Sequence, residues 1–464
     1  MLTHKRLIAL LTALMLVLAA CSGDGETTDT TADSGDDTTA TTAAPDDSGD
    51  DTTETTEATP SGEPDVDDMA GTSVNIFGPE AAEEGEAIAA ALEPFAEETG
   101  IEITYVGAGD FSDQINVQVD GGNPPDIAIF PQPGKLADFS RQDFVQPLPD
   151  DLTAQVKENW SEAWWTFGDV DGTQYGIPIK TDLKSLVWYS PSRFADNGYE
   201  IPATYQEWLD LYDQMISDGN TPLCVGIESG PATGWPFTDW VEDLMLRQAG
   251  PEFYDQWVAH EIPFNNETTT DIFAQINDLW SRDGAVFAAG GSIASTGFGN
   301  NAQPLVEGNC EMHRQASFFT AFMPEGTTLG PDGDVNAFYF PAETADEQPV
   351  LGAGTLAAAF RDAPEVWAVM EYLNSPEYAN TRIEVQGGGF LTAVAGQDLS
   401  LYSSFEQGLV DILSNATVVR FDASDLMPAA VGSGSFWTAA TDLVTGSMTP
   451  QEATDFVEES WPTG

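Results

Sequence analysis

The fold is decided by residues 73–130, which read SVNIFGPEAAEEGEAIAAALEPFAEETGIEITYVGAGDFSDQINVQVDGGNPPDIAIF. Short apolar runs at 73–77, 101–106 and 127–130 have the length and composition of β-strands. Between them, apolar residues recur at helical spacing, and we expect Gly100 to end the first helix and Asp110 to cap the second. Strands alternating with helices at this spacing predict an α/β fold with a parallel sheet. A ligand crevice is then expected at the carboxyl ends of the strands, which hold 77–80, 107–110 and 131–133.

The N-terminal segment predicts export and lipid anchoring. Residues 1–20 combine Lys5 and Arg6 with an apolar run that is short for a membrane span, which is typical of a signal peptide. The cysteine that follows Leu18-Ala19-Ala20 resembles that of a bacterial lipobox, which implies cleavage before Cys21 and lipid attachment to its thiol. An ordinary signal peptide with a chance cysteine is the alternative. Residues 22–70 hold 16 acidic and no basic side chains, so we interpret 21–70 as the lipidated cysteine and a disordered acidic linker.

Residues 71–464 have the composition of a globular protein, and their length favours two lobes. They carry 61 acidic and 12 basic side chains, a net charge of −49, so nucleic acid is a poor partner. Apart from Cys21, the mature chain has only Cys224 and Cys310. In an oxidising compartment an isolated pair predicts a disulfide, with two buried free thiols as the alternative.

Groups suited to catalysis or to metal binding are scarce. The mature chain has two histidines, His260 and His313, and it contains no G-x-S-x-G, P-loop or H-E-x-x-H motif. The run 352–357 matches G-x-G-x-x-A, but the residues after it read as a strand where a dinucleotide site needs a helix. We therefore predict no catalytic residue, no metal and no cofactor.

Aromatic residues gather in two places. Trp235, Phe237 and Trp240 surround Asp239, and Trp437 follows the small-residue run 432–435. Exposed rings beside carboxylates suit sugars, because a ring covers the C–H face while polar groups bind the hydroxyls. Core packing is the alternative for each of these rings.

Several segments, in this order, resemble the extracellular solute-binding proteins of ABC importers, in the maltose-binding branch (family 1). They are 122–126 before an apolar strand, 176–178 followed by 185–189, 363–377, and 427–428 followed by 436–437. Within the family, 228–240 and 310–318 resemble the α-glucoside-binding subgroup.

The resemblance implies a two-lobed periplasmic-binding-protein fold (type II-like), with the ligand in the cleft between the lobes. The lobes would comprise 71–183 plus 347–394 and 184–346 plus 395–464, joined by hinge crossovers near 179–184, 350–354 and 393–396. In family members a sugar-binding carboxylate lies where Asp182 stands, a second-lobe carboxylate at Glu228, and a stacking ring at Trp437. The candidate ligand-binding residues are Glu80, Asp110, Lys180, Asp182, Glu228, Trp235, Arg314 and Trp437.

These features predict a monomeric, non-enzymatic, extracytoplasmic lipoprotein, anchored to the cell membrane, that captures a sugar, a small α-glucoside or oligosaccharide, and delivers it to ABC permease subunits. A binding protein for a polyamine or another non-sugar ligand is one alternative, although Lys180, Lys184 and Arg314 argue against a cationic ligand. A glycoside hydrolase that uses two carboxylates is another. A purely structural surface protein is the third alternative.

Overall fold

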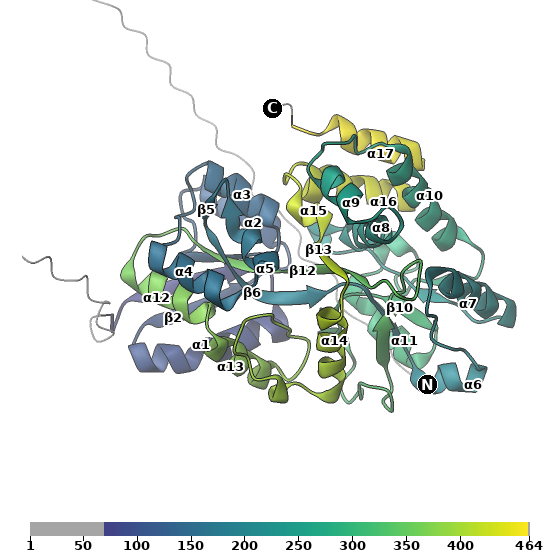
Figure 1. Ribbon diagram of the computed structural model, residues 1–464, viewed down its shortest axis with the longest axis horizontal. Helices are drawn as coiled ribbons and strands as arrows, with labels where there is room; N and C mark the ends of the chain where they lie inside the picture. The colour runs from purple at the N-terminus through teal and green to yellow at the C-terminus, as the bar shows by residue number, and fades with distance from the viewer. Residues whose placement is uncertain (1–68, 463–464) are drawn as a thin grey trace, which may run out of the picture. The chain divides into compact units, whose positions relative to one another are not determined.

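The computed structural model describes residues 69–462, which form two large β-sheets covered by helices (Figure 1) and a two-stranded sheet of β4 (Asp169–Val170) and β5 (Thr173–Gln174). The predicted signal peptide, Cys21 and almost all of the predicted linker lie outside the described residues. In the part of the chain that the structure describes, none of the helices combines the length and the apolar character needed to cross a membrane.

The first sheet contains the strands predicted from residues 73–130. Its members are β13 (Val418–Phe421), β12 (Pro349–Ala359), β3 (Ile127–Phe130), β1 (Ser73–Gly78) and β2 (Glu102–Gly107), with β6 (Gly176–Leu183) also paired to β12. As predicted, β1 pairs in parallel with both β2 and β3. β12 runs antiparallel to β3, so a segment far along the chain completes this sheet.

Helices cover both faces of the first sheet, because its strands are apolar on both sides. Val74 and Ile76 of β1 pack in one core cluster with Ile88 and Leu92 of α1 (Ala82–Thr99). Phe77 of β1 and Ala128 and Phe130 of β3 pack on the other side against α2 (Phe111–Asp120) and α3 (Pro133–Arg141). The remaining helices of this part are α4 (Asp150–Asn159), α5 (Glu162–Trp165), α12 (Pro364–Leu373) and α13 (Pro376–Gln386). The α/β architecture is thus confirmed.

The second sheet is mixed and shorter-stranded. Its order is β11 (Asn336–Tyr339), β7 (Leu186–Tyr189), β10 (Met312–Arg314), β8 (Leu223–Cys224) and β9 (Val286–Phe287). The helices around it include α7 (Tyr205–Asp218), α8 (Trp235–Gln248), α9 (Pro251–Val258), α10 (Glu267–Ser281), α16 (Trp437–Val444) and α17 (Pro450–Glu459). Cys224 and Cys310 form a disulfide, which confirms the predicted pairing.

The chain passes between the two sheets after β6 and again before β12. β6 ends at Leu183 in the first sheet and β7 begins at Leu186 in the second. β12 pairs along its length with β6, and Thr181 of β6 also bridges to Leu391. These are the regions where the resemblance placed the hinge crossovers. β13 belongs to the predicted second-lobe segment 395–464, yet it pairs with β12 of the first sheet.

One local prediction needs correction. Asp110 precedes α2 at the N-cap position, but its side chain caps no backbone N–H, and its φ of −101° and ψ of 28° differ from the extended geometry of capping residues. Its carboxylate instead accepts a hydrogen bond from the side-chain amide of Gln114 at 2.5 Å. Thr204 does cap α7, as its position before the helix predicts.

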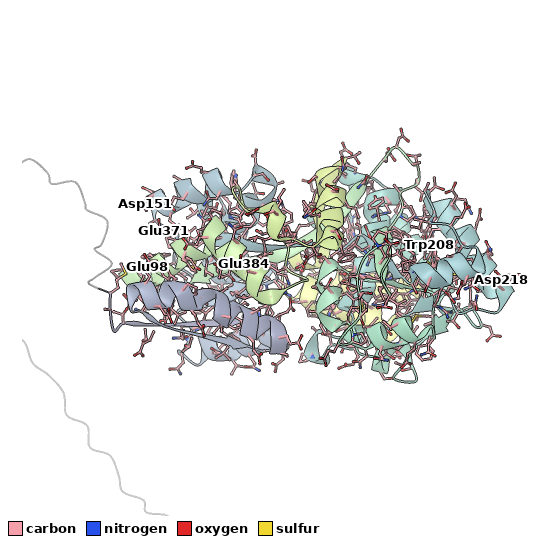
Figure 2. All side chains as sticks on the ribbon, turned by 90° about the horizontal axis from the view of Figure 1, so that it is seen from below. Glu98, Asp151, Trp208, Asp218, Glu371 and Glu384 are labelled. Atoms are coloured by element: carbon pink, nitrogen blue, oxygen red, sulfur yellow. A yellow bond between two sulfur atoms is a disulfide. The ribbon has the colours of Figure 1, made fainter. Side chains whose placement is uncertain are left out.

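The acidic side chains lie mainly on the surface. Figure 2 shows Glu98, Asp151, Asp218 and Glu371 on different helices, all exposed, whereas Trp208 is fully buried. A solvated acidic exterior around an aromatic core accounts for most of the net charge. The acids that are buried therefore call for a specific explanation.

Candidate functional site

A cavity of about 220 Å³ lies between strands and strand ends of the first sheet and the helices and loops packed around the second sheet. Its wall combines carboxylates, two lysines and aromatic rings. The charged members are Glu80, Glu84, Lys180, Asp182, Lys184, Asp422 and Asp425, and the aromatic members are Phe111, Trp235, Phe298, Phe318, Phe322 and Trp437. This mixture lets one small molecule contact polar groups and apolar surfaces at once.

The carboxyl ends of the first three strands form one part of the wall, as the parallel topology predicts. Pro79 and Glu80 follow β1, Gly109 follows β2, and Pro131 and Gln132 follow β3. Glu80 is buried, and Tyr105 donates its hydroxyl hydrogen to the Glu80 backbone oxygen at 2.9 Å. Burial raises the pKa of Glu80 above its ordinary value, although the nearby Lys180 opposes that shift.

The connecting strand β6 supplies alternate residues to the cavity. Lys180 and Asp182 are two residues apart in β6, so the strand projects them to the same face, and Lys184 directly follows the strand; all three line the wall. Lys180 Nζ lies 3.2 Å from Glu84 Oε1 and 3.6 Å from Asp182 Oδ2. Burial by itself would lower the pKa of Lys180, but Asp182, Glu84 and Glu80 raise it above the usual value, so this ammonium stays charged.

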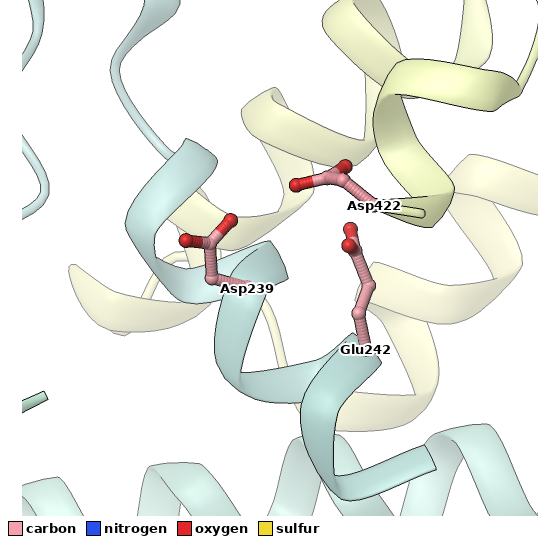
Figure 3. A group of neighbouring side chains, drawn as sticks. All are labelled: Asp239, Glu242 and Asp422. Carbon is pink, nitrogen blue, oxygen red and sulfur yellow. The ribbon is translucent and has the colours of Figure 1, made fainter. Parts of the chain in front are cut away.

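Lys184 is the counter-ion of a buried acidic cluster behind the wall. Asp239, Glu242 and Asp422 place carboxylate oxygens within 4.8 Å of one another (Figure 3), a spacing that could also hold a metal ion. However, Lys184 Nζ bonds Asp239 Oδ1 at 2.7 Å and also bonds Asp422 Oδ2. The ammonium thus balances two of these carboxylates directly.

The protonation of this cluster follows from its burial. Burial raises the pKa of Asp239 to about 7, against the attraction of Lys184. For Glu242, burial and then the neighbouring Asp422 raise the pKa well above the ordinary value. The pKa of Asp422 is about 2 despite its burial, because Lys184 stabilises the ionised form. Lys184 thus stabilises the ionised form of Asp422, whereas burial beside Asp422 favours the protonated form of Glu242.

Two tryptophans form the aromatic wall. Trp235 begins α8 and lies with its ring centroid 5.0 Å from Phe298, while Lys184 Nζ is 5.4 Å from the Trp235 centroid. Trp437 begins α16 directly after a π-helical turn, a feature common at functional sites. Gly234 has a φ of +117°, and a Cβ there would lie 2.2 Å from the Trp437 backbone oxygen. Only glycine permits this close approach of the two segments.

The structure brings together five of the eight predicted ligand-binding residues. Those that line the cavity are Glu80, Lys180, Asp182, Trp235 and Trp437. Among the described residues, the lining set does not include Asp110, Glu228 or Arg314. Glu228 accepts a hydrogen bond from the backbone N–H of Gly230 at 2.8 Å, and its neighbour Ser229 reaches the wall. Arg314 is buried and bonds Asp243 at 2.5 Å, so it supports the second lobe.

Sequence reasoning missed several residues of the wall, including Glu84, Thr355, Asp422 and Asp425. A local sequence pattern could have identified Lys184 as a wall residue, since it continues the alternation of Lys180 and Asp182.

The sequence could also have identified Phe237 and Trp240 as core residues, because with Val241 and Leu244 they repeat at helical spacing. All four are buried in the core, so the alternative of core packing holds for these two rings.

Comparison with known proteins identifies the family of this chain. The model of the bacterial extracellular solute-binding protein family matches residues 78–380. The osmoprotective compounds-binding protein GgtB of Synechocystis sp. is 41% identical over 397 residues, covering 84% of this chain and 92% of that protein. The alpha-glucosides-binding periplasmic protein AglE of Rhizobium meliloti is 38% identical over 409 residues, covering 85% and 88%.

Solved structures share the fold. The bacterial solute receptor AcbH matches with a TM-score of 0.73 at 18% identity, over 84% of this chain and 98% of that chain. Maltose-bound MalE3 of T. maritima matches with a TM-score of 0.66 at 14% identity, over 84% and 98%. These are two-lobed solute-binding proteins, which agrees with two sheets joined by β6 and β12. The chain therefore belongs to the family of bacterial extracellular solute-binding proteins.

Proposed function

We propose that this protein is the lipid-anchored, monomeric binding component of an ABC importer, and that it captures an uncharged sugar, a small α-glucoside or oligosaccharide, for delivery to the permease. The observation that carries the proposal is the wall of the cavity, where Trp235 and Trp437 stand beside carboxylates and lysines. The name of AglE, an alpha-glucosides-binding protein, supports the sugar class. The lipid anchor rests on the sequence around Cys21.

The charges of the wall favour an uncharged ligand over an acidic one. Five carboxylates and two lysines line the cavity. Lys180 is already paired with Glu84 and Asp182, and Lys184 with Asp239 and Asp422. An anionic sugar would meet surplus carboxylates while both ammonium groups are engaged, so it would be repelled.

A thermal-shift panel tests the sugar class. Methyl α-glucoside, maltose, trehalose and sucrose are compared with glucuronate and spermidine. A sugar at 100 times its Kd should stabilise the protein by about 2.7 kcal/mol. The proposal expects at least one neutral sugar to stabilise and glucuronate to have no effect. Stabilisation by spermidine alone would instead favour the polyamine alternative, for which the surplus of carboxylates is the supporting observation. Chromatography of the same mixtures should return the sugars intact, since hydrolysis would indicate a glycosidase.

Replacing Trp437 by alanine should weaken sugar binding, because a sugar ring would lose its stacking surface. We expect a loss of about 1–3 kcal/mol, or roughly 5- to 150-fold in Kd. Calorimetry with the best-binding sugar of the panel measures the change. Trp367 is a matched control, since it lies on α12, is half-buried and is not part of the lining. Equal affinities of Trp437→Ala and Trp367→Ala would exclude Trp437 as a ligand contact.

Binding should also make the protein more compact. The wall combines residues of the first sheet with Trp235 of α8 and Trp437 of α16, so a ligand that contacts both sides favours their approach about the connections at β6, β12 and residues 391–394. Small-angle scattering should therefore give a smaller radius of gyration when the sugar is saturating. An unchanged radius at saturation, verified by calorimetry, would contradict closure.

A further inference from the structure

Thr355 stands in the cavity wall on β12, opposite Lys180 of β6. Its side chain is 5% exposed, and its hydroxyl oxygen is buried without a hydrogen-bond partner among the described residues. Its neighbour Gly354 fixes the strand, because a Cβ at Gly354 would lie 2.2 Å from the Lys180 backbone oxygen. The close pairing of β6 and β12 thus holds an unsatisfied hydroxyl at the wall of the site.

A buried hydroxyl without a partner lowers stability, and the strand would accept valine, which has the same shape and no polar atom. A ligand that binds beside such an unsatisfied polar group can supply the missing hydrogen-bond partner. A hydroxyl both donates and accepts, which suits the hydroxyls of a sugar. Rotation about χ1 redirects Oγ1 without moving the backbone.

We propose that Thr355 is a specificity-determining residue that hydrogen-bonds a hydroxyl of the bound ligand from the β12 side of the cavity. This inference rests on the proposed function, because it requires a ligand with hydroxyls. It adds a residue outside the set predicted from the sequence. It also implies that the free protein is less stable than it would be with an apolar residue at position 355.

Thr181 provides a matched control in the same pair of strands. It lies in β6 opposite Gly354, is fully buried, and its hydroxyl oxygen also has no hydrogen-bond partner within residues 69–462. It differs from Thr355 in one respect, since the described lining of the cavity does not include it. Thr181→Val therefore removes a comparable hydroxyl from a position away from the ligand.

The experiment measures sugar affinity and thermal stability for Thr355→Val, Thr355→Ser and Thr181→Val. Its probe is whichever of methyl α-glucoside, maltose, trehalose and sucrose stabilises the wild-type protein most. We expect Thr355→Val to raise Kd by about 2- to 12-fold while leaving the ligand-free melting temperature equal or higher. Thr355→Ser, which keeps the hydroxyl, should bind within about twofold of wild type. Thr181→Val should raise the melting temperature without changing Kd.

The outcomes separate this inference from the proposed function. If no sugar of the panel binds the wild-type protein, the proposed function fails first. If a sugar binds and Thr355→Val retains the wild-type Kd, the function stands and the role of Thr355 is overturned. The role is also overturned if Thr181→Val weakens binding as much as Thr355→Val, or if Thr355→Ser weakens it equally. A lower affinity together with a stable ligand-free fold supports a direct contact, which a purely structural threonine would not produce.

Discussion

Replacing Asp243 by alanine is expected to lower the free energy of unfolding by about 3–5 kcal/mol, because the buried guanidinium groups of Arg247 and Arg314 lose their counter-ion. Asp243 Oδ1 accepts hydrogen bonds from Arg247 and, at 2.9 Å, from the hydroxyl of Ser185. Its Oδ2 accepts from Arg314 at 2.5 Å. The Ser185 hydroxyl oxygen in turn accepts a hydrogen bond from the backbone N–H of Leu351 at 2.8 Å. Through Ser185, Asp243 is therefore linked both to the turn between β6 and β7 and to β12. Urea unfolding followed by circular dichroism measures the loss.

Asp213 gives the matched comparison. Its carboxylate lies 2.7 Å from Arg282, but the two side chains are 60% and 45% exposed, so water solvates either charge when the pair is broken. Asp213→Ala should therefore cost at most about 1 kcal/mol. If Asp243→Ala costs no more than Asp213→Ala, the backbone carbonyls near Arg247 and Arg314 suffice for these guanidinium groups, and the explanation fails.

Removing the disulfide is expected to cost about 4 kcal/mol. Cys224 and Cys310 are 86 residues apart and both are buried, so the bond closes a long loop in the unfolded chain. It also links β8 to the residues that precede β10. β8 and β10 themselves pair in parallel at Leu223 and Met312. Cys224→Ala/Cys310→Ala should therefore unfold at markedly lower urea concentration.

Reductant supplies the control for the disulfide. Dithiothreitol in the urea titration should bring the wild-type protein toward the stability of the double variant, and it should not affect the variant. If the double variant and the oxidised wild-type protein unfold at the same urea concentration, the disulfide does not constrain the unfolded state as the chain-entropy model requires.

Much of the fold could be predicted because it depends on local patterns. The strands predicted at 73–77, 101–106 and 127–130 coincide within one residue with β1, β2 and β3. Their apolar periodicity needs no information from elsewhere in the chain. Asp110 was the exception, since a capping bond depends on the backbone angles at one residue, which composition does not fix.

The site was only partly predictable. Glu80 could be anticipated from its place after a parallel strand, because topology brings strand ends together. Trp235 and Trp437 could be suggested from their neighbouring residues, but core packing remained the alternative, since a ring that lines a cavity and a ring in the core look alike in sequence. Arg314 was expected at the cleft because it lies in the segment 310–318 that resembles the α-glucoside-binding subgroup, yet it is buried against Asp243.

By itself, then, the sequence determined the alternation of strands and helices, the excess of acidic over basic side chains and the pair Cys224 and Cys310, because each is a property of composition or of short-range spacing. Only the tertiary structure decided which buried charges meet. Lys184 pairs with Asp239 and Asp422, which lie 55 and 238 residues away along the chain. Thr355 likewise acquired its place only through the pairing of β6 with β12. The physical reason is that desolvation makes a charge or hydroxyl depend on its neighbours in space, and those neighbours are chosen by the packing of the whole chain.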